Sequence, residues 1–509
     1  MESGVVTSLL WGSVQSLITP SFLVIILLGV IAGIIFGILP GFGAAQALAL
    51  LFPFTYSMDG IQVVIFMLAA YSAAEYGGSI PAILIRTPGT PSAAITTIEA
   101  YPLAQRGFPR KTLRISLTAG LIGGVLSTAA FIAAGPLLAW IGLRFGPSEM
   151  FAVGVFGLSI ISSFLGGSVL NGFLSTAVGL WLATIGNSDF GGMRFTFDWS
   201  YLYDGIPLLV VIIGILAMPE AFRLICSSTM GEGADETQAA HLPRKWNAKD
   251  RLSWLEFKRL LPSFLRGSVV GTAIGIMPGA GGTVASIVSY NEERRWSKRG
   301  HLFGSGVEEG VAGPEAANNA VVAGALVPTL ALGIPGSASA AVLLGVMIGK
   351  GVVPGPLLFH DQPGFVMQVF IGLIIINLVL YGVGWMGTNV FAWVTRLPNS
   401  ILGPVVMILI LIGTYSYRTE FMDVVIALGF GVVGYILEKI KFPTLPMLLA
   451  FVMQPIMEEN LLRALSLYND IFSVMSRPLT AVILLLAVSS AVWGYLRSRQ
   501  KSPDAAATL

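Results

Sequence analysis

Long runs of apolar residues alternate with short polar stretches along most of the chain. Four of the longest apolar runs cover residues 22–39, 208–218, 369–384 and 479–496. Each run approaches or reaches the roughly 20 apolar residues that an α-helix needs to cross a bilayer. The pattern therefore predicts an all-α polytopic membrane protein with roughly a dozen membrane segments.

The composition supports this prediction. Of the 509 residues, 55% are hydrophobic and only 11% are charged, whereas soluble domains carry about 25% charged residues. The formal net charge is +2, so the chain has no excess of positive charge that would favour a nucleic-acid partner.

The basic residues are concentrated in a few polar stretches, at residues 105–114, 241–266, 291–299 and 496–501. Loops rich in Lys and Arg stay on the cytoplasmic side of a membrane. These stretches are therefore predicted to be cytoplasmic, which places the C-terminus inside and the N-terminus outside.

Two sequence motifs occur twice, in the same order. "GILPGFG" at residues 37–43 returns as "GIMPGAG" at 275–281, and "PGTPSAA" at 88–94 returns as "PGSASAA" at 335–341. The copies are 238 residues (37 to 275) and 247 residues (88 to 335) apart. Two motifs repeated at similar offsets indicate an internal duplication.

This duplication divides the chain into three parts. Residues 1–226 form the first transmembrane repeat, 227–257 a polar cytoplasmic linker, and 258–509 the second repeat with additional C-terminal helices. In the first repeat the basic stretch follows the second motif, whereas in the second repeat it lies between the two motifs. Matched loops therefore lie on opposite sides of the membrane, which predicts an inverted-topology repeat, a design common in secondary transporters.

Each of the four motifs contains Pro-Gly, which interrupts a helix. Broken helices in a membrane leave backbone groups unpaired and are tolerated only inside protein or beside water. The helix that starts after each break offers its N-terminus to an anion, and the carbonyl groups before it can bind a cation. The residues predicted to form these ion-binding breaks or hairpin tips are Pro40, Gly41, Gly43, Pro88, Gly89, Pro278, Gly279, Gly281, Pro335 and Gly336.

The four breaks are expected to have two forms. Residues 266–294 have basic residues at both ends and Pro-Gly in the middle. They are predicted to form a re-entrant hairpin from the cytoplasm, and the matching "GILPGFG" a hairpin from outside. The PGTPSAA and PGSASAA motifs are predicted to be unwound parts of membrane-spanning helices.

Polar residues near the breaks are candidate substrate ligands: Arg86, Thr90, Ser92, Asn318, Asn319, Ser337 and Ser339. Arg86 can bind a substrate carboxylate in a bidentate manner, or it pairs with Glu75 or Glu99. Asn318 and Asn319 bind substrate or cap a helix, with the cap favoured.

The neighbouring Glu308 and Glu309 are expected in a solvated loop. The chain is not expected to be an enzyme, because its three histidines, His241, His301 and His360, lie in polar contexts without an HExxH motif.

The motif regions resemble a known family. "GILPGFGAAQALALLFPFTYSMD", "EYGGSIPAILIRTPGTPSAA" and "GPEAANNAVVAGALVPTLALGIPGSASAAVLLG" are similar to the large membrane subunit of bacterial tripartite tricarboxylate transporters. The resemblance implies an inner-membrane importer of citrate-like or other carboxylates. It also implies two partners, a small membrane subunit and a periplasmic solute-binding protein. No cofactor is expected, and transport is driven by a sodium or proton gradient.

The mechanism favoured by two hairpins entering from opposite sides is alternating access of an elevator-like kind. The alternative is a channel or scaffold subunit of a membrane complex, since broken helices and inverted repeats occur in channels too. Uptake against a gradient distinguishes a transporter from a channel.

Overall fold

The computed structural model describes residues 3–39, 41–165, 169–188, 191–229, 250–394 and 399–500. These residues are almost entirely helical, and their β-structure is one short antiparallel ribbon in which Gly186 pairs with Arg194. The all-α fold that the apolar runs predict is therefore confirmed.

The elements of the first half end close to the predicted linker. They are α1 (Ser3–Leu17), α2 (Pro20–Ile38), α3 (Ala44–Leu51), η1 (Phe52–Thr55), α4 (Gly60–Ile85), η2 (Pro91–Ala94), α5 (Thr96–Gln105), α6 (Pro109–Gly142), α7 (Pro147–Leu165), α8 (Val169–Ala183), β1 (Gly186–Asn187), β2 (Met193–Arg194), η3 (Ser200–Leu202), α9 (Leu208–Ile212), the π-helical turn η4 (Ile213–Ala217) and α10 (Met218–Thr229).

The second half begins within the predicted linker. Its elements are α12 (Trp254–Ile276), α13 (Gly281–Trp296), η5 (Gly300–Leu302), α14 (Glu309–Leu332), α15 (Ala338–Gly349), α16 (Pro356–Asp361), α17 (Pro363–Val394), α18 (Asn399–Arg418), α19 (Phe421–Lys439), α20 (Leu445–Tyr468), α21 (Ile471–Met475) and α22 (Pro478–Gln500). Residues 230–249 of the linker lie outside the described residues.

The helix lengths fit a multi-pass membrane protein. Among the described residues, eight helices are long and apolar enough to cross a membrane, and five shorter apolar helices accompany them. The outer helices expose large apolar side chains such as Leu485 and Ile412, as lipid-facing helices do. By contrast, the membrane-length window of α4 is fully buried and that of α14 is 94% buried. Helices α4 and α14 therefore form the centre of the molecule.

The duplication is visible in the helix packing. Helix α2 packs against α4 in the first half, as α12 packs against α14 in the second. A Cβ added at Gly33 would lie 2.3 Å from the Ala70 carbonyl oxygen, and one added at Gly271 would lie 2.1 Å from that of Ala317. Gly271 follows Gly33 by 238 residues, and Ala317 follows Ala70 by 247. The same two offsets that separate the motifs thus also separate matching contacts.

The two halves have opposite orientations. The first turn of α6 contains Lys111, which pairs with Glu256 at 2.5 Å, beside the start of α12. The other end of α6 contains Gly142, whose Cβ would lie 2.6 Å from Pro356. Helix α6 has 34 residues, so these ends are about 50 Å apart at 1.5 Å per residue. The basic loop before α6 and its counterpart near residue 356 therefore lie at opposite ends of the molecule, as an inverted repeat requires.

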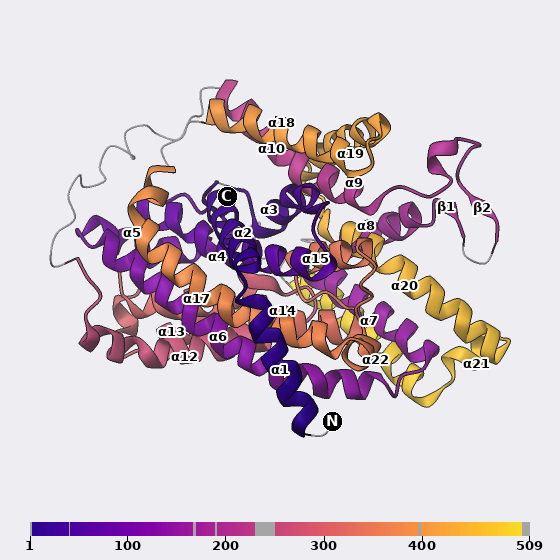
Figure 1. Ribbon diagram of the computed structural model, residues 1–509, viewed down its shortest axis with the longest axis horizontal. Helices are drawn as coiled ribbons and strands as arrows, with labels where there is room; N and C mark the ends of the chain where they lie inside the picture. Colours follow the sequence, from indigo (N-terminus) through magenta and orange to yellow (C-terminus); the bar gives the residue numbers. More distant parts are fainter. Residues whose placement is uncertain are drawn as a thin grey trace.

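Several helices pack against the opposite half (Figure 1). Helix α6 lies on α14, and α17 lies on α4. Helices α7 and α8 pack against α20, with α22 against α7, and α10 packs against α18 and α19. In Figure 1, α5, α12 and α13 gather at the left end, whereas the β1–β2 ribbon and α21 lie at the right. These contacts between helices of different halves join the two repeats into one helical body.

Candidate functional site

The two hairpin motifs form tight turns between helices. The GIMPGAG motif connects α12 to α13, and the GILPGFG motif connects α2 to α3. Gly279 and Gly41, which are matched in the repeat, have φ angles of +78° and +79°, a conformation that glycine adopts without steric cost. Both interruptions predicted for these motifs are therefore present, although Pro40 lies outside the described residues.

The PGTPSAA and PGSASAA motifs each interrupt a buried helical path. Helix α4 ends at Ile85 and helical structure resumes at Pro91, whereas α14 ends at Leu332 and α15 begins at Ala338. The backbone N–H of Gly89 donates to the Gly78 carbonyl at 3.0 Å, and that of Gly279 donates to the Gly336 carbonyl at 3.1 Å. These bonds satisfy some of the backbone groups that the breaks release.

The four breaks lie close together. At the first hairpin, a Cβ on Gly43 would lie 3.6 Å from the Pro91 ring. At the second hairpin, a Cβ on Gly282 would lie 3.3 Å from the Ser92 Cβ, and one on Gly281 would lie 4.0 Å from that of Ser337. Elements from both halves thus meet around one buried position.

Polar side chains line this meeting point. The Tyr71 hydroxyl on α4 is hydrogen-bonded to the Ser337 hydroxyl at 2.9 Å, and Ser337 caps α15 by accepting from the Ala340 N–H at 3.1 Å. The Ser92 hydroxyl donates to the Glu75 carboxylate at 2.9 Å, and it also lies 3.0 Å from the Thr90 hydroxyl. The α4 helix is therefore hydrogen-bonded to both broken segments.

A second buried carboxylate, Glu315, lies on α14. Glu315 is fully buried, and the Ser79 hydroxyl lies 2.8 Å from both of its oxygen atoms. The Ser116 hydroxyl donates to it at 2.6 Å, and Thr96 also donates to it. This carboxylate ties α4, α5, α6 and α14 together inside the protein.

The structure brings most of the predicted ligands together. Thr90, Ser92, Asn318, Ser337 and Ser339 are all at least nine-tenths buried and come from the segments that meet at the breaks. Figure 1 shows α4, α14 and α15 at the centre of the molecule.

Two predicted ligands have different surroundings. Asn319 donates to the Glu315 carbonyl at 3.0 Å and lies against Gly120 on α6. Arg86 is exposed, and its guanidinium lies 5.9 Å from the centre of the Tyr101 ring. Glu75 instead accepts from Ser92, and Glu99 accepts from Tyr290 at 2.8 Å. The alternative in which Arg86 pairs with Glu75 or Glu99 is therefore not what the structure shows.

Two further expectations are wrong. Asn318 and Asn319 do not cap a helix, because they lie in the middle of α14, whose N-cap is Glu308. Glu308 and Glu309 do not lie in a solvated loop, because their side chains are only 9% and 12% exposed. Arg299 pairs with both carboxylates, and Lys111 and Arg259, which are distant in the sequence, pair with Glu308.

The sequence analysis missed several hydroxyl groups of the site. These are Tyr71, Ser79, Thr96 and Ser116. A signal for two of them was present, since Tyr71, Glu75 and Ser79 are spaced four residues apart within an apolar helix and lie on one face. The other two reach the site only through the packing of α5 and α6.

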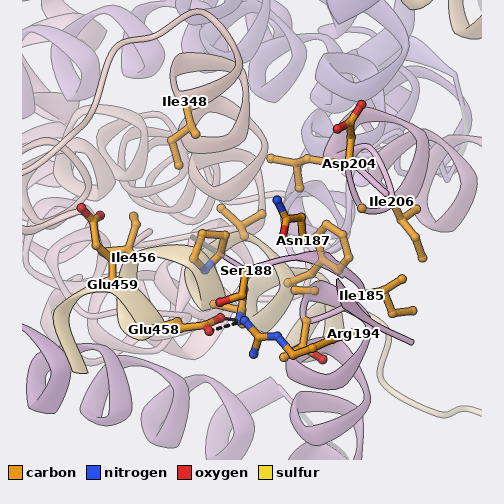
Figure 2. A pocket seen from close by; sticks show the side chains of 18 of the residues that line it. Ile185, Asn187, Ser188, Arg194, Asp204, Ile206, Ile348, Ile456, Glu458 and Glu459 are labelled. Atoms are coloured by element: carbon orange, nitrogen blue, oxygen red, sulfur yellow. Dashed lines mark hydrogen bonds and ion pairs between the residues drawn. The ribbon is translucent and has the colours of Figure 1, made fainter. Parts of the chain in front are cut away.

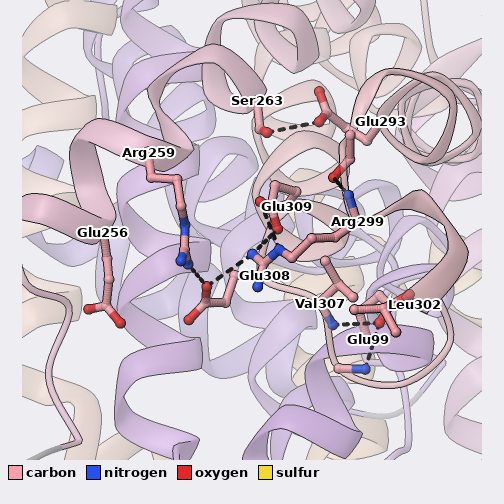
Figure 3. Close-up of polar contacts among 12 residues, drawn as sticks. Glu99, Glu256, Arg259, Ser263, Glu293, Arg299, Leu302, Val307, Glu308 and Glu309 are labelled. Carbon is pink, nitrogen blue, oxygen red and sulfur yellow. Dashed lines mark hydrogen bonds and ion pairs between the residues drawn. The ribbon is translucent and has the colours of Figure 1, made fainter.

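An ionic cluster closes the end of the molecule that contains the basic stretches (Figure 3). Glu308 pairs with Arg299 at 3.3 Å, and also with Lys111 and Arg259. Burial raises the pKa of Glu256, but hydrogen bonds from Lys111 and Ser253 outweigh it and lower the pKa to about 2. The cluster holds the starts of α6, α12 and α14 together.

A second part of this end is held by Glu99. Its carboxylate accepts from the backbone N–H groups of Gly306 and Val307, each at 2.7 Å, as Figure 3 shows for Val307. Burial raises the pKa of Asp250, although the N–H groups of Lys111 and Arg110 at the start of α6 oppose this shift. These contacts fix the loop before α14 against α5.

A cleft of about 400 Å³, seen from close by in Figure 2, opens beside the β1–β2 ribbon, which lies at the opposite end of the molecule in Figure 1. Its wall includes Arg194, which pairs with Glu458 on α20 at 2.5 Å. Ile456 also lines this cleft and lies 3.9 Å from a Cβ built at Gly333. The cleft therefore reaches the helix end that precedes the PGSASAA break.

A separate cavity of about 300 Å³ lies beside the start of α20. It is lined by Gln46 of α3, just after the first hairpin tip, and by Glu220 of α10 and Glu438 of α19. Arg223 pairs with Glu220 at 2.6 Å and occupies the space beside Gly41. Polar openings thus approach the breaks from two different sides.

Comparisons with known proteins identify a family that this chain resembles over most of its length. A family model described as "Tripartite tricarboxylate transporter TctA family" matches residues 23–449. An uncharacterized 52.8 kDa protein in the TAR-I ttuC' 3'region of Agrobacterium vitis is 33% identical over 501 residues, which is 96% of both chains. An uncharacterized protein in the TAR-II ttuC' 3'region of the same organism is 35% identical over 244 residues, 46% of this chain and 97% of that protein.

No solved structure matches the chain. The family match covers both hairpin motifs and both unwound motifs, so the residues that form the candidate site lie within it. Members of this family are large subunits of tripartite transporters, which excludes an enzyme as the family's function. The chain belongs to the tripartite tricarboxylate transporter TctA family.

Proposed function

We propose that this chain is the large membrane subunit of a secondary active importer for a carboxylate, either a citrate-like tricarboxylate or a related organic acid. The observation that carries the proposal is the meeting of four helix breaks, from two inverted halves, at one buried polar position. Broken helices at the midplane are where secondary transporters bind substrates and coupling ions. The proposed driving force is a sodium or proton gradient.

The substrate carboxylate is proposed to bind at the start of α15. The N-terminus of a helix attracts anions through its free N–H groups and its dipole. Ser337 and Ser339 are buried there, and Tyr71 supplies a third hydroxyl. Arg86 stays in the proposal as a residue that meets the substrate in another conformation, since its side chain is exposed in this one.

The proposed mechanism is alternating access with an elevator-like movement. Helices α2–α5 and α12–α15, with η1 and η2, form the transport module, and α7–α10, α18–α20 and α22 form the scaffold. Contacts between the two groups include α3 against η4 and α18 against η1. The module carries substrate from the cleft near Ile456 toward the cavity near Gln46.

The proposed setting follows from the family and the charge pattern. The chain works in a bacterial inner membrane with its N-terminus outside and its C-terminus inside. It is joined by a small membrane subunit, and a periplasmic solute-binding protein delivers the substrate. Residues 1–226 and 258–509 are the two repeats of the importer, and 227–257 is their cytoplasmic linker.

Transport is tested by uptake into proteoliposomes that contain the complete transporter. A panel of radiolabelled di- and tricarboxylates is supplied with the binding protein, under an imposed sodium or proton gradient. We expect accumulation above the external concentration that stops when the gradient is dissipated. Conductance without accumulation would instead support the channel alternative.

The binding site is tested in the same assay with Ser92→Ala and Ser337→Ala. Each variant is expected to lower uptake at least about tenfold, the effect of losing about 1.4 kcal/mol of binding energy. Ser268→Ala is the control, because Ser268 is buried on α12 and, within the part of the chain that the structure describes, its hydroxyl bonds to its own helix, at the Phe264 carbonyl. Normal uptake by both site variants would remove the site as proposed.

The elevator is tested with a disulfide between module and scaffold. A Cβ at Gly413 on α18 would lie 3.0 Å from the Cβ of Pro53 in η1, close to the spacing of about 3.8 Å in disulfides. Pro53→Cys with Gly413→Cys, in a Cys226→Ser background, is expected to stop uptake when oxidised and to recover on reduction. A disulfide between Met218→Cys and Gly431→Cys, both within the scaffold, is the control. Full uptake by the oxidised first pair would exclude the movement.

A further inference from the structure

The polar cluster at the breaks contains a charge that the proposed substrate cannot balance. Glu75 is 8% exposed and Glu315 is fully buried. Among the described residues, the side chains that donate to these carboxylates are uncharged, and most are hydroxyl groups. A buried charge without an opposite charge is costly, so this part of the cluster favours a cation over a carboxylate.

Asn318 points to the position of that cation. The side chain is 1% exposed, and neither its oxygen nor its nitrogen has a hydrogen bond of normal geometry among the described residues. Its oxygen lies 2.4 Å from a Cβ built at Gly282, which would also lie 3.3 Å from the Ser92 Cβ, and Ser92 donates to the Glu75 carboxylate. An unbonded carboxamide oxygen beside a carboxylate, both inside a membrane protein, is typical of a functional site.

We propose that a sodium ion binds between Glu75, Ser92, Thr90 and Asn318. The four side chains supply a carboxylate, two hydroxyl groups and a carboxamide oxygen, which are the hard oxygen ligands that such cations prefer. The ligands come from α4, from the PGTPSAA break and from α14 of the other half. The inference rests on the proposed function and assigns Thr90, Ser92 and Asn318 to the coupling ion instead of the substrate.

A sodium ion fits this position better than a proton. A proton bound to Glu75 would occupy one carboxylate oxygen and could satisfy one acceptor at most. A sodium ion contacts several oxygen atoms at once, including the Asn318 oxygen, which no described residue satisfies with a hydrogen bond. Gly282 keeps this side of the position open, because a Cβ there would collide with that oxygen.

The position of the ion also explains how it would be coupled to the anion. Tyr71 precedes Glu75 by one turn of α4 and is bonded to Ser337, at the start of α15. Without a cation, the charge of Glu75 repels a carboxylate that approaches this helix end. With sodium bound, the repulsion is neutralised, so the anion binds after the cation.

The test measures sodium binding by the purified full-length chain, without substrate. Radioactive sodium is added at constant ionic strength with choline as the replacement salt, and binding is read by scintillation proximity. Wild-type protein is expected to bind sodium saturably. Glu75→Gln and Asn318→Ala are each expected to weaken binding at least about tenfold, equivalent to about 1.4 kcal/mol.

Two controls keep the result interpretable. Glu292→Gln makes the same chemical change at a partly exposed position on α13 and is expected to bind as wild type. Asn318→Ala removes a buried amide that makes no hydrogen bond of normal geometry with the described residues, so it is expected to fold even where Glu75→Gln fails to fold. Monodisperse elution and unchanged helical circular dichroism identify the folded variants.

The outcomes separate the two proposals. Sodium binding that is equal in wild type and in folded Asn318→Ala overturns the site. Absence of sodium binding by wild-type protein also overturns the site. Proton release from wild type but not from Glu75→Gln would then favour a proton as the ion at this position. If sodium binds as expected but no carboxylate accumulates in proteoliposomes, the cation site stands and the proposed transport function fails.

Discussion

Arg86 and Gly333 occupy matched positions in the two halves and share one unusual backbone conformation. Their φ angles are 59° and 73°, and each residue caps the C-terminus of the helix that precedes a break. Glycine adopts this left-handed conformation freely, whereas a residue with a Cβ pays about 1 kcal/mol. The first half thus keeps an arginine where the backbone favours glycine, which indicates a role for the side chain.

Replacing Arg86 by glycine separates the cost of the left-handed backbone from the contribution of the guanidinium to transport. Arg86→Gly is expected to raise the free energy of unfolding by up to about 1 kcal/mol, because glycine removes the cost of the left-handed cap. It is also expected to lower carboxylate uptake. Thermal unfolding in detergent and proteoliposome uptake measure these quantities, and a stabilised variant with full uptake would show that the guanidinium is dispensable.

The close approach at the two unwound motifs leads to a second prediction. A Cβ at Gly89 would lie 2.1 Å from the Gly37 carbonyl oxygen, and one at Gly336 would lie 2.5 Å from that of Gly275. Gly89→Ala and Gly336→Ala are therefore each expected to destabilise the protein by about 3 kcal/mol.

The matched control is Gly382→Ala on α17, where a Cβ would meet none of the described atoms within 4 Å. The yield of monodisperse protein and its thermal midpoint compare the variants. Normal yields for both motif variants would show that the backbones do not approach as closely as described.

The bond between Tyr71 and Ser337 joins the two halves directly. A neutral buried hydrogen bond contributes about 1 kcal/mol, and Ser337 also caps α15. Tyr71→Phe is expected to cost about 1 kcal/mol and Ser337→Ala about 2 kcal/mol. The double variant is expected to cost less than the two single costs together, because the shared bond is lost only once. Additive costs in thermal unfolding would argue against the bond.

The ionic cluster around Glu308 gives a prediction about stability. Glu308→Gln leaves Lys111, whose side chain is 9% exposed, with one carboxylate partner fewer. We expect a loss of about 2 kcal/mol, toward the lower end of the effect of breaking a buried pair because Arg259 and Arg299 can turn to solvent. The comparison is Glu292→Gln, whose ion pair is exposed and whose loss should cost less than about 1 kcal/mol.

The lowered pKa of Glu256 predicts a pH dependence. The pKa falls from 4.5 to about 2 in the folded protein, so the contact with Lys111 stabilises the fold fully above pH 4.5. This contribution is lost as the pH falls from 4.5 toward 2. The difference in thermal midpoint between wild type and Glu256→Gln should therefore be larger at pH 7 than at pH 3. An equal difference at both pH values would contradict the assigned role of the charge.

The sequence alone determined the fold class and the helix breaks. Apolar runs specify membrane helices because the bilayer has one thickness, and Pro-Gly interrupts a helix wherever it occurs. The repeated motifs and the basic loops also predicted the inverted halves, since both signals are local and can be counted along the chain. For the same reason, Thr90, Ser92, Ser337 and Ser339 were identified beside the breaks.

Tertiary structure alone decided which polar groups share a site. Thr96 and Ser116 meet Glu315 from segments about 200 residues away in the chain. Asn318 and Ser92 both lie beside Gly282 because α13 and α14 pack against the PGTPSAA break. Arg86 was placed outside this cluster by its left-handed cap. Such contacts depend on how helices pack, and packing joins residues whose spacing in the sequence carries no periodic signal.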